Sequence, residues 1–152
     1  MTGDAVLLVT SSGGVLLDLL ALEPWWHGYE PRWVAVRAPD TVGALAGQHV
    51  EWVPELTAGR PYALASAVRD AARRLRRLHP RAVVSAGSGV AVPYFVAARA
   101  LGVPALWVET YNVVGRSGLA SRLAGRLATA VVVQHQELLA RHRRSVYVGE
   151  LL

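Results

Sequence analysis

Short runs of apolar residues alternate along this chain with longer segments of helical periodicity. The runs are four to six residues long, rich in Val, Ala and Leu, and bounded by Gly, Pro or polar residues. Such runs are typical of strands that are buried on both faces of a parallel sheet. We expect strands at 5–10, 33–37, 49–53, 82–85, 105–109, 130–134 and 145–148.

The segments between these runs predict helices. In the longest, 62–78, Leu75 and Leu78 fall on an apolar side, and His79-Pro80 should end the helix. The opposite side carries four arginines, Arg69, Arg73, Arg76 and Arg77. Further helices are expected at 15–22, 41–46, 90–101 and 118–128.

Strands that alternate with helices predict an α/β fold, a doubly wound parallel sheet with right-handed crossovers. No low-complexity linker divides the chain, so we expect one Rossmann-like domain over residues 1–152. The apolar run near the amino terminus is too short for a signal peptide or a membrane span. The expected location is therefore the cytoplasm.

The amino-acid composition excludes several kinds of functional site. The sequence has no cysteine, which excludes a disulfide framework, a thiolate nucleophile and a cysteine-based metal site. Its net charge of +5 comes from arginine alone, because there is no lysine. An arginine excess suits anionic partners but equally reflects ordinary solvation or coding bias, so charge decides nothing about function. We expect no cofactor, no metal and no nucleic acid.

Two glycine-rich turns follow expected strands. They have the sequences Ser11-Ser12-Gly13-Gly14 and Ser85-Ala86-Gly87-Ser88-Gly89. In an open parallel sheet, ligands bind beyond the carboxyl ends of the strands, where small residues let backbone N–H groups approach phosphate oxygens. A single turn of this kind is more often structural, whereas two turns in one domain favour a ligand. The candidate ligand-binding residues here are Ser11, Ser12, Gly13, Gly14, Ser85, Gly87, Ser88 and Gly89.

A carboxylate ends the strand expected at 105–109. Glu109 is followed by Thr110, Tyr111 and Asn112. A carboxylate in this position can accept a hydrogen bond or a proton from a sugar hydroxyl, and an amide can both donate and accept. Glu109 is the candidate catalytic residue, with Tyr111 and Asn112 as further ligand contacts, although a capping role explains the carboxylate equally well.

The stretch VVSAGSGVAVPYFVAARALGVPALWVETYN, residues 83–112, resembles the acceptor-side subunits of bipartite glycosyltransferases. These include the bacterial exopolysaccharide subunits called PssD or EpsE and the related membrane-recruiting subunit of the eukaryotic two-subunit N-acetylglucosamine transferase. The opening VTSSGG and the segments VVVQHQELL and SVYVGELL are similar to the same proteins, so the likeness spans nearly the whole chain. A more distant likeness is to the amino-terminal half of MurG.

The resemblance implies one half of a GT-B glycosyltransferase, inactive without a donor-binding partner subunit. The partner would supply the UDP-sugar, and this chain would meet a polyprenyl-pyrophosphate-linked acceptor at the inner face of the cell membrane. Gly13, Gly14, Gly87 and Gly89 match glycine-loop positions of the family, and Glu109 matches its acidic position.

One position departs from the family pattern. Relatives commonly carry histidine directly after the first Gly-Gly, whereas this chain has Val15. If that histidine is a base or a phosphate contact, another group must replace it. Glu109 is the first candidate, followed by His135 after an expected strand and His27 in a loop of uncertain position.

The segment 116–128 suggests a peripheral membrane contact. It sets Leu119, Leu123 and Leu127 in one stripe and Arg122 and Arg126 in the next, as in helices that lie on an anionic bilayer. The alternative is that the leucines pack on the sheet while the arginines are solvated.

Two other functions stay open. A free-standing dinucleotide-binding module is disfavoured, because Gly13-Gly14 does not complete G-x-G-x-x-G and Val36-Arg37, not an acidic residue, closes the second strand. A non-catalytic scaffold that recruits its partner to the membrane is favoured by the missing histidine.

Overall fold

The computed structural model describes residues 4–56, 59–109, 119–134, 136–141 and 145–147. Their strands form one seven-stranded parallel sheet in the order β3-β2-β1-β4-β5-β6-β7. The doubly wound α/β fold predicted from the strand and helix pattern is confirmed. The strands are β1 (Ala5–Thr10), β2 (Glu30–Val36), β3 (Val50–Val53), β4 (Ala82–Ser85), β5 (Ala105–Glu109), β6 (Ala130–Val133) and β7 (Ser145–Tyr147).

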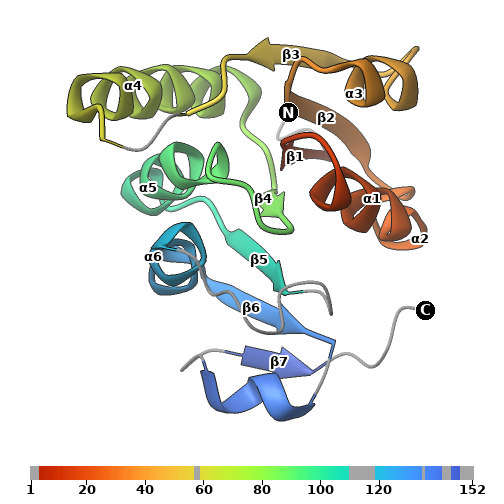
Figure 1. Ribbon diagram of the computed structural model, residues 1–152, viewed down its shortest axis with the longest axis vertical. Coiled ribbons are helices and arrows are strands. Elements are labelled where there is room, and N and C mark those ends of the chain that lie inside the picture. The colour runs from red at the N-terminus through yellow and green to blue at the C-terminus, as the bar shows by residue number, and fades with distance from the viewer. Residues whose placement is uncertain (1–3, 57–58, 110–118, 135, 142–144, 148–152) are drawn as a thin grey trace.

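Helices cover both faces of this sheet (Figure 1). One face carries α1 (Gly14–Ala21), α2 (Glu23–Trp26) and α3 (Pro39–Ala44). The other carries α4 (Pro61–Leu78), α5 (Ala91–Leu101) and α6 (Leu119–Leu127), and a short 3-10 helix, η2 (Gln136–Arg141), lies next to β7. Helix α4 ends as expected at His79, which adopts a left-handed conformation with φ 48° before Pro80.

Helix α2 and the start of β2 differ from the expectation, α3 begins and ends two residues earlier than expected, and η2 was not expected. The sequence around Trp25 and Trp26 was expected to be a loop, but residues Glu23–Trp26 form the turn of helix α2, with Glu23 and Pro24 at its start. Acidic residues and proline are both favoured in the first turn of a helix. Strand β2 also begins at Glu30, earlier than expected, because its first residues continue the pairing with β1.

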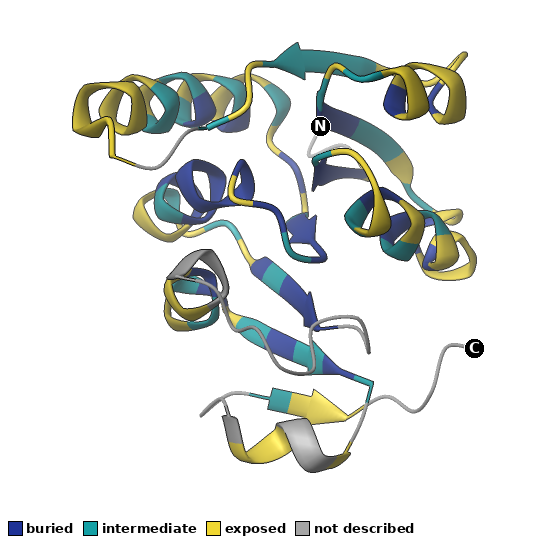
Figure 2. Ribbon diagram, viewed as in Figure 1, coloured by how far each residue is buried: buried dark blue, intermediate teal, exposed yellow. Residues whose placement is uncertain are grey.

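Two apolar cores hold the layers together. Alternate residues of each strand point to opposite faces, so Val34 packs toward α4 and α5 while Trp33 and Ala35 pack toward α1 and α2. Figure 2 shows that the buried residues follow the strands and the inner sides of the helices, with exposed residues on the outer sides. Trp26 reinforces the second core, where its indole N–H donates to the Leu19 carbonyl at 2.8 Å and its ring meets Trp33 edge-on.

The strand order reverses in the middle of the sheet. From β1 the chain builds outward through β2 and β3, then returns through α4 to place β4 on the other side of β1. All pairings are parallel, so the carboxyl ends of β1 and β4 meet at one edge. Such a switch point is where doubly wound sheets bind their ligands.

Candidate functional site

The two glycine loops lie side by side at the switch point between β1 and β4. Gly87 adopts φ +134°, a conformation that other residues rarely adopt, and a Cβ built there would lie 3.7 Å from the Val15 side chain. Val15 is the second residue of α1, directly after the first loop. Val15, the residue directly after the first Gly-Gly, therefore faces the second loop, and it brings an apolar group to the shared edge.

The first loop, 11–14, is open to solvent. Ser12, Gly13 and Gly14 are exposed, and Gly13 begins α1 with φ +79°. The N–H of Gly13 donates to the Asp40 carboxylate at 2.8 Å, and Asp40 also accepts from the N–H of Thr41 at 2.9 Å. Helix α1 has no acidic residue in its own first turn, so Asp40 supplies the negative charge that helix N-termini favour. The Gly13 N–H, one of the donors expected to bind phosphate, is thus already hydrogen-bonded to a side chain of the protein.

The second loop, 85–89, is built differently. Ser85, Ala86 and Ser88 are buried, and the Ser88 hydroxyl accepts the N–H of Val90 at 3.2 Å, which caps the start of α5. The buried Ser85 hydroxyl has no hydrogen-bond partner among the described residues. The backbone N–H groups of residues 87–89 likewise donate to no acceptor among the described residues. Unengaged donors beside a helix N-terminus suit an anionic oxygen.

Glu109 ends β5, the strand next to β4. Ser85 pairs in register with Trp107, so Glu109 stands two residues beyond the last paired position of the second loop's strand. Glu109 is only 2% exposed, and it interacts with another group of the protein, as a buried carboxylate requires. The structure therefore places Glu109 at the expected edge, but inside the protein instead of on an open rim.

The other candidates fall into two groups. Tyr111, Asn112 and His135 lie outside the described residues. His27 does not belong to this edge, because it precedes β2 and so lies at the amino ends of the strands, with its side chain 80% exposed. The expectation that His27 could replace the missing histidine is therefore wrong.

The proposed membrane helix α6 has a mixed face. Arg122, Leu123 and Arg126 are exposed, with Leu123 at 40%, while Ala124 is buried and Leu127 packs against the core. Of the leucines whose side chains are described, Leu123 thus faces solvent and Leu127 the sheet, and the two arginines form no ion pair with the described residues. Within the described ranges, no helix is long and apolar enough to cross a membrane. The same ranges contain no group of three or more His, Asp or Glu residues able to hold a metal ion.

Asp40 and Arg74 were not among the candidates, although the sequence contains patterns that predict where their side chains lie. Asp40 follows the carboxyl end of β2, which neighbours β1, so its loop had to lie near the first glycine loop. Arg74 lies three residues after buried Ala71 in α4, and this spacing turns its side chain inward. Arg74 bridges Glu51 of β3 and Tyr94 of α5.

The chain has sequence relatives among N-acetylglucosamine transferases and their subunits. No known family model matches the chain. It is 34% identical to the UDP-N-acetylglucosamine transferase subunit ALG14 of Eremothecium gossypii, in a match that covers 99% of this chain and 75% of that protein. It is also 34% and 35% identical to the UDP-N-acetylglucosamine–N-acetylmuramyl-(pentapeptide) pyrophosphoryl-undecaprenol N-acetylglucosamine transferases of Sinorhizobium fredii and Rhizobium meliloti. The chain spans only 37% and 36% of the length of these two transferases.

Solved structures show the same fold. MurG of Acinetobacter baumannii superposes with a TM-score of 0.77 at 22% identity, over 95% of this chain and 45% of that one. The UDP-GlcNAc 2-epimerase of Neisseria meningitidis, bound to UDP-GlcNAc, superposes with a TM-score of 0.71 at 13% identity, over 97% and 47%. The fold is that of one half of a GT-B glycosyltransferase. Together with the sequence identities, it shows that the chain belongs to the family of the N-acetylglucosamine transferase subunit ALG14, related to the MurG-like transferases.

Proposed function

We propose that this chain is the acceptor-side subunit of a two-component glycosyltransferase. A partner subunit binds UDP-N-acetylglucosamine or a similar UDP-sugar, and the sugar passes to a polyprenyl-pyrophosphate-linked acceptor held by this chain. The product belongs to polysaccharide or oligosaccharide biosynthesis, as in the PssD and EpsE subunits of exopolysaccharide assembly. Residues 1–152 act as one domain, inactive without the partner.

The pattern of coverage carries this proposal. The chain matches three quarters of a relative named as a subunit, but only about a third of the relatives named as whole transferases. It also covers 45% of the MurG chain. In a GT-B fold the cleft that joins donor and acceptor lies between two such halves, so the half described here supplies one wall of that cleft.

The chemistry proposed for this half rests on the groups at the carboxyl ends of β1, β4 and β5. The unengaged N–H groups of 87–89 receive the acceptor pyrophosphate. The acceptor hydroxyl attacks the anomeric carbon of the donor sugar, the bond to UDP breaks with its electron pair, and the hydroxyl proton passes to Glu109. Because Glu109 is buried, this role requires that the acceptor and partner expose it.

A scaffold function is the second candidate. Two features favour it: Val15 stands where the resemblance implies a histidine, and the Glu109 carboxylate is almost completely buried. In that case the chain would bring the donor subunit to the membrane, and the catalytic groups would all come from the partner.

Donor binding tests the assignment of the two halves. In calorimetric titrations of the isolated chain with UDP-N-acetylglucosamine, UDP-glucose and GDP-mannose, we expect dissociation constants weaker than about 1 mM. Addition of the partner subunit should create a tight site for one UDP-sugar. Micromolar binding of a UDP-sugar by the isolated chain would contradict the division into donor and acceptor subunits.

Membrane contact is the part of the proposal assigned to Arg122 and Arg126 on α6. Sedimentation with vesicles should require anionic lipid and weaken as salt shortens the Debye length from about 10 Å at 0.1 M to about 3 Å at 1 M. Changing both arginines to Gln should reduce it, whereas the same change at the exposed Arg69 and Arg73 of α4 serves as the matched control. Equal losses for the two pairs would contradict a specific role of α6.

A further inference from the structure

A cavity of about 390 Å³ opens at the carboxyl end of β3, between the first half of α4 and the start of α5. Val90 and Pro93 line it, and these residues directly follow the second glycine loop. The cavity is therefore a neighbour of the candidate site, on the face of the sheet opposite α1. Its volume lies at the lower end of the range for small-molecule pockets, which is about 300 to 1,000 Å³.

The charges that line this cavity cancel. Arg60 and Arg74 contribute two positive charges, and Glu55 and Asp70 contribute two negative charges. Outside the cavity, Glu51 pairs with both Arg74 and Arg77, and Arg73 bonds to Asp70 at 3.2 Å, so the charged groups of the lining are largely paired. A cavity with no excess of positive charge is a poor site for phosphate and suits an uncharged ligand.

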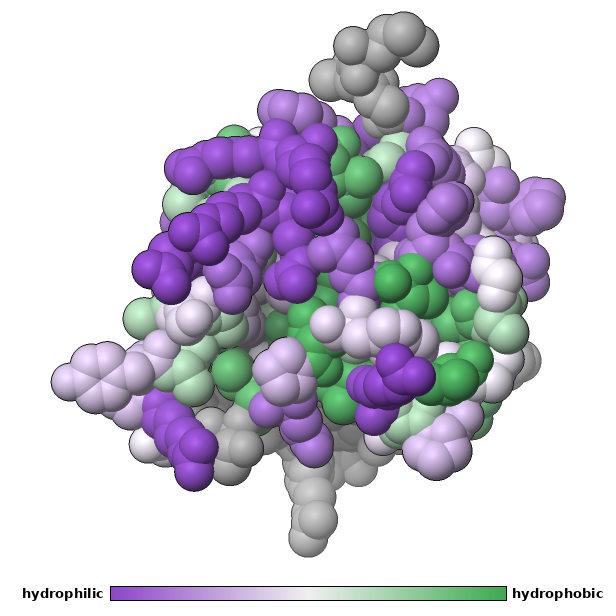
Figure 3. Space-filling model, turned by 90° about the horizontal axis from the view of Figure 1, so that it is seen from above, coloured by the Kyte–Doolittle hydropathy of each residue, from purple (hydrophilic) through white to green (hydrophobic). Residues whose placement is uncertain are grey.

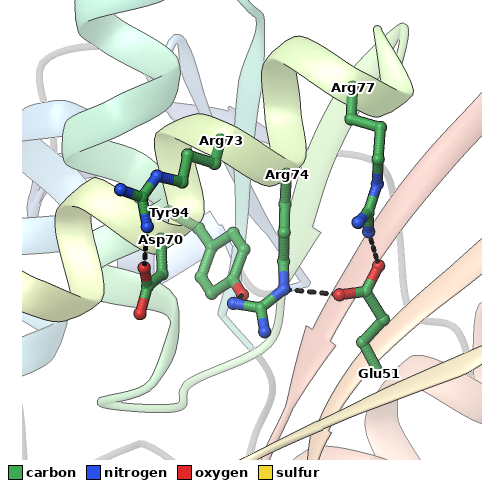
Figure 4. Close-up of polar contacts among 6 residues, drawn as sticks. All are labelled: Glu51, Asp70, Arg73, Arg74, Arg77 and Tyr94. Atoms are coloured by element: carbon green, nitrogen blue, oxygen red, sulfur yellow. Dashed lines mark hydrogen bonds and ion pairs between the residues drawn. The ribbon is translucent and has the colours of Figure 1, made fainter.

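Arg74 and Tyr94 present fixed polar groups at one wall (Figure 4). The Nε of Arg74 donates to Glu51 at 2.5 Å and its Nη1 donates to the Tyr94 hydroxyl at 3.1 Å, so the guanidinium has little freedom to rotate. Its Nη2 has no acceptor among the described residues. Burial raises the pKa of the Tyr94 hydroxyl above its ordinary value, despite the nearby Arg74 guanidinium, so this group keeps its proton and can donate it.

Apolar surfaces complete the cavity. Trp52, Pro54, Leu56 and Pro93 line it with ring and aliphatic carbons. Figure 3 shows the face formed by α4, β3 and α3, where hydrophilic residues gather over α4 and hydrophobic residues run across the middle. A pyranose ring needs this combination, because it has C–H faces that pack on apolar rings and hydroxyls that need both donors and acceptors.

We propose that this cavity binds an uncharged sugar residue of the acceptor, next to the pyrophosphate at the second glycine loop. This inference rests on the proposed function, since it names the part of the acceptor that this half of the enzyme recognises. The Tyr94 hydroxyl and Arg74 Nη2 donate to sugar oxygens, Asp70 and Glu55 accept from sugar hydroxyls, and the sugar ring lies on the apolar wall.

Titration of the ¹⁵N-labelled chain with neutral saccharides tests the proposal. The probes are the methyl β-glycosides of N-acetylglucosamine, glucose and galactose, with inorganic pyrophosphate and UDP as charged comparators. At least one glycoside should shift the amide signals of Ala63, Ala67 and Tyr94, which border the cavity, with a dissociation constant of about 1 to 10 mM. The charged probes should leave these signals in place.

Two tyrosine variants sharpen the test. Tyr94→Phe removes one donor and should weaken glycoside binding about tenfold, whereas Tyr62→Phe makes the same change at a tyrosine of α4 that is 91% exposed and should have no effect. Tyr94→Phe also removes a hydrogen-bond partner of Arg74, so a second variant is needed. Ser66 lines the exposed rim of the cavity and makes no hydrogen bond with the described residues through its side chain. Ser66→Ala should therefore weaken glycoside binding without disturbing Arg74.

Two results would overturn the assignment: no glycoside moves the cavity signals, or pyrophosphate or UDP moves them instead. Either failure differs from failure of the proposed function, which is measured by turnover with the partner subunit. An active pair whose cavity ignores all three glycosides would refute the sugar site alone.

Discussion

The two glycine loops look alike in sequence and differ in almost every structural respect. The first is exposed, and its leading N–H is engaged by Asp40 from the next strand's loop. The second is largely buried, caps its own helix through Ser88, and leaves the N–H groups of 87–89 without partners among the described residues. A glycine-rich turn is thus no guarantee of a phosphate site, because what decides is whether the protein already occupies the donors.

This difference assigns separate roles to the two sides of the switch point. The first loop is exposed and is joined to α3 through the Asp40 carboxylate, and Val15 after it faces Gly87 of the second loop. We propose that the second loop, whose N–H groups at 87–89 donate to no described residue, receives the anionic part of the acceptor, with Glu109 on the adjoining strand β5. The predictions below test this asymmetry, from the largest expected effect to the smallest.

Glu109 should show the largest effect, on turnover by the assembled pair. Glu109→Gln keeps the shape of the side chain but removes its basicity, and loss of a general base lowers the rate by about 10² to 10⁴-fold. The matched control is Glu23→Gln on α2, an exposed carboxylate away from this edge, which should change turnover little. If Glu109→Gln stays active while Glu109→Ala fails, the carboxylate only positions its neighbours and the base lies elsewhere.

Alanine at Gly87 should cost the most stability. Gly87 has φ +134°, so a side chain there stores strain of about 1 to 3 kcal/mol. Gly14→Ala in the first loop meets nothing within 4 Å at an ordinary backbone conformation and should be neutral or stabilising by up to about 1 kcal/mol. Urea unfolding followed by tryptophan fluorescence compares the two, and equal losses would remove the structural distinction between the loops.

Alanine in place of the loop serines should produce a smaller difference in the free energy of unfolding. Ser88 caps the start of α5, so Ser88→Ala should lower the free energy of unfolding by about 1 kcal/mol. Ser12 is exposed, and the same change there should stay within about 0.5 kcal/mol. Thermal unfolding of both variants gives the contrast, and a Ser88→Ala protein as stable as the parent would show that the buried hydroxyl is not a cap.

Asp40→Asn should have the smallest effect on stability and the most informative effect on binding. The single carbonyl oxygen of the amide can accept only one of the two N–H groups, of Gly13 and Thr41, that Asp40 holds. Loss of the favourable charge at the start of α1 costs about 0.3 to 1 kcal/mol. Without that charge, pyrophosphate should bind the first loop more tightly, as seen by amide shifts at 13–15. Unchanged pyrophosphate affinity would show that Asp40 does not keep anions from this loop.

Most of the fold could be predicted because buried parallel strands leave a clear mark in the sequence. Runs such as 5–10 and 82–85 are apolar up to their last residue, and glycine turns follow them. Helix α2 was missed because four residues with two tryptophans carry too little periodicity to separate a helical turn from a loop.

The candidate site was predicted in position but not in detail. The edge itself follows from topology, and so does the meeting of the two loops. The engagement of Gly13 by Asp40, 27 residues away, depends on strand order and side-chain conformation, which local patterns do not encode. The inward turn of Arg74 was encoded by its spacing from Ala71, yet the charge of arginine favours assignment to the solvent face.

Reconstitution with the donor subunit tests the central claim most directly. The chain would be assayed for sugar transfer from UDP-N-acetylglucosamine to a polyprenyl-pyrophosphate-linked acceptor, alone and with a partner that carries the other GT-B half. The account predicts no detectable transfer by either protein alone and clear turnover by the pair, with dependence on Glu109 in this chain. Full activity of the isolated chain, or a pair whose turnover survives both Glu109→Gln and Glu109→Ala, would contradict it.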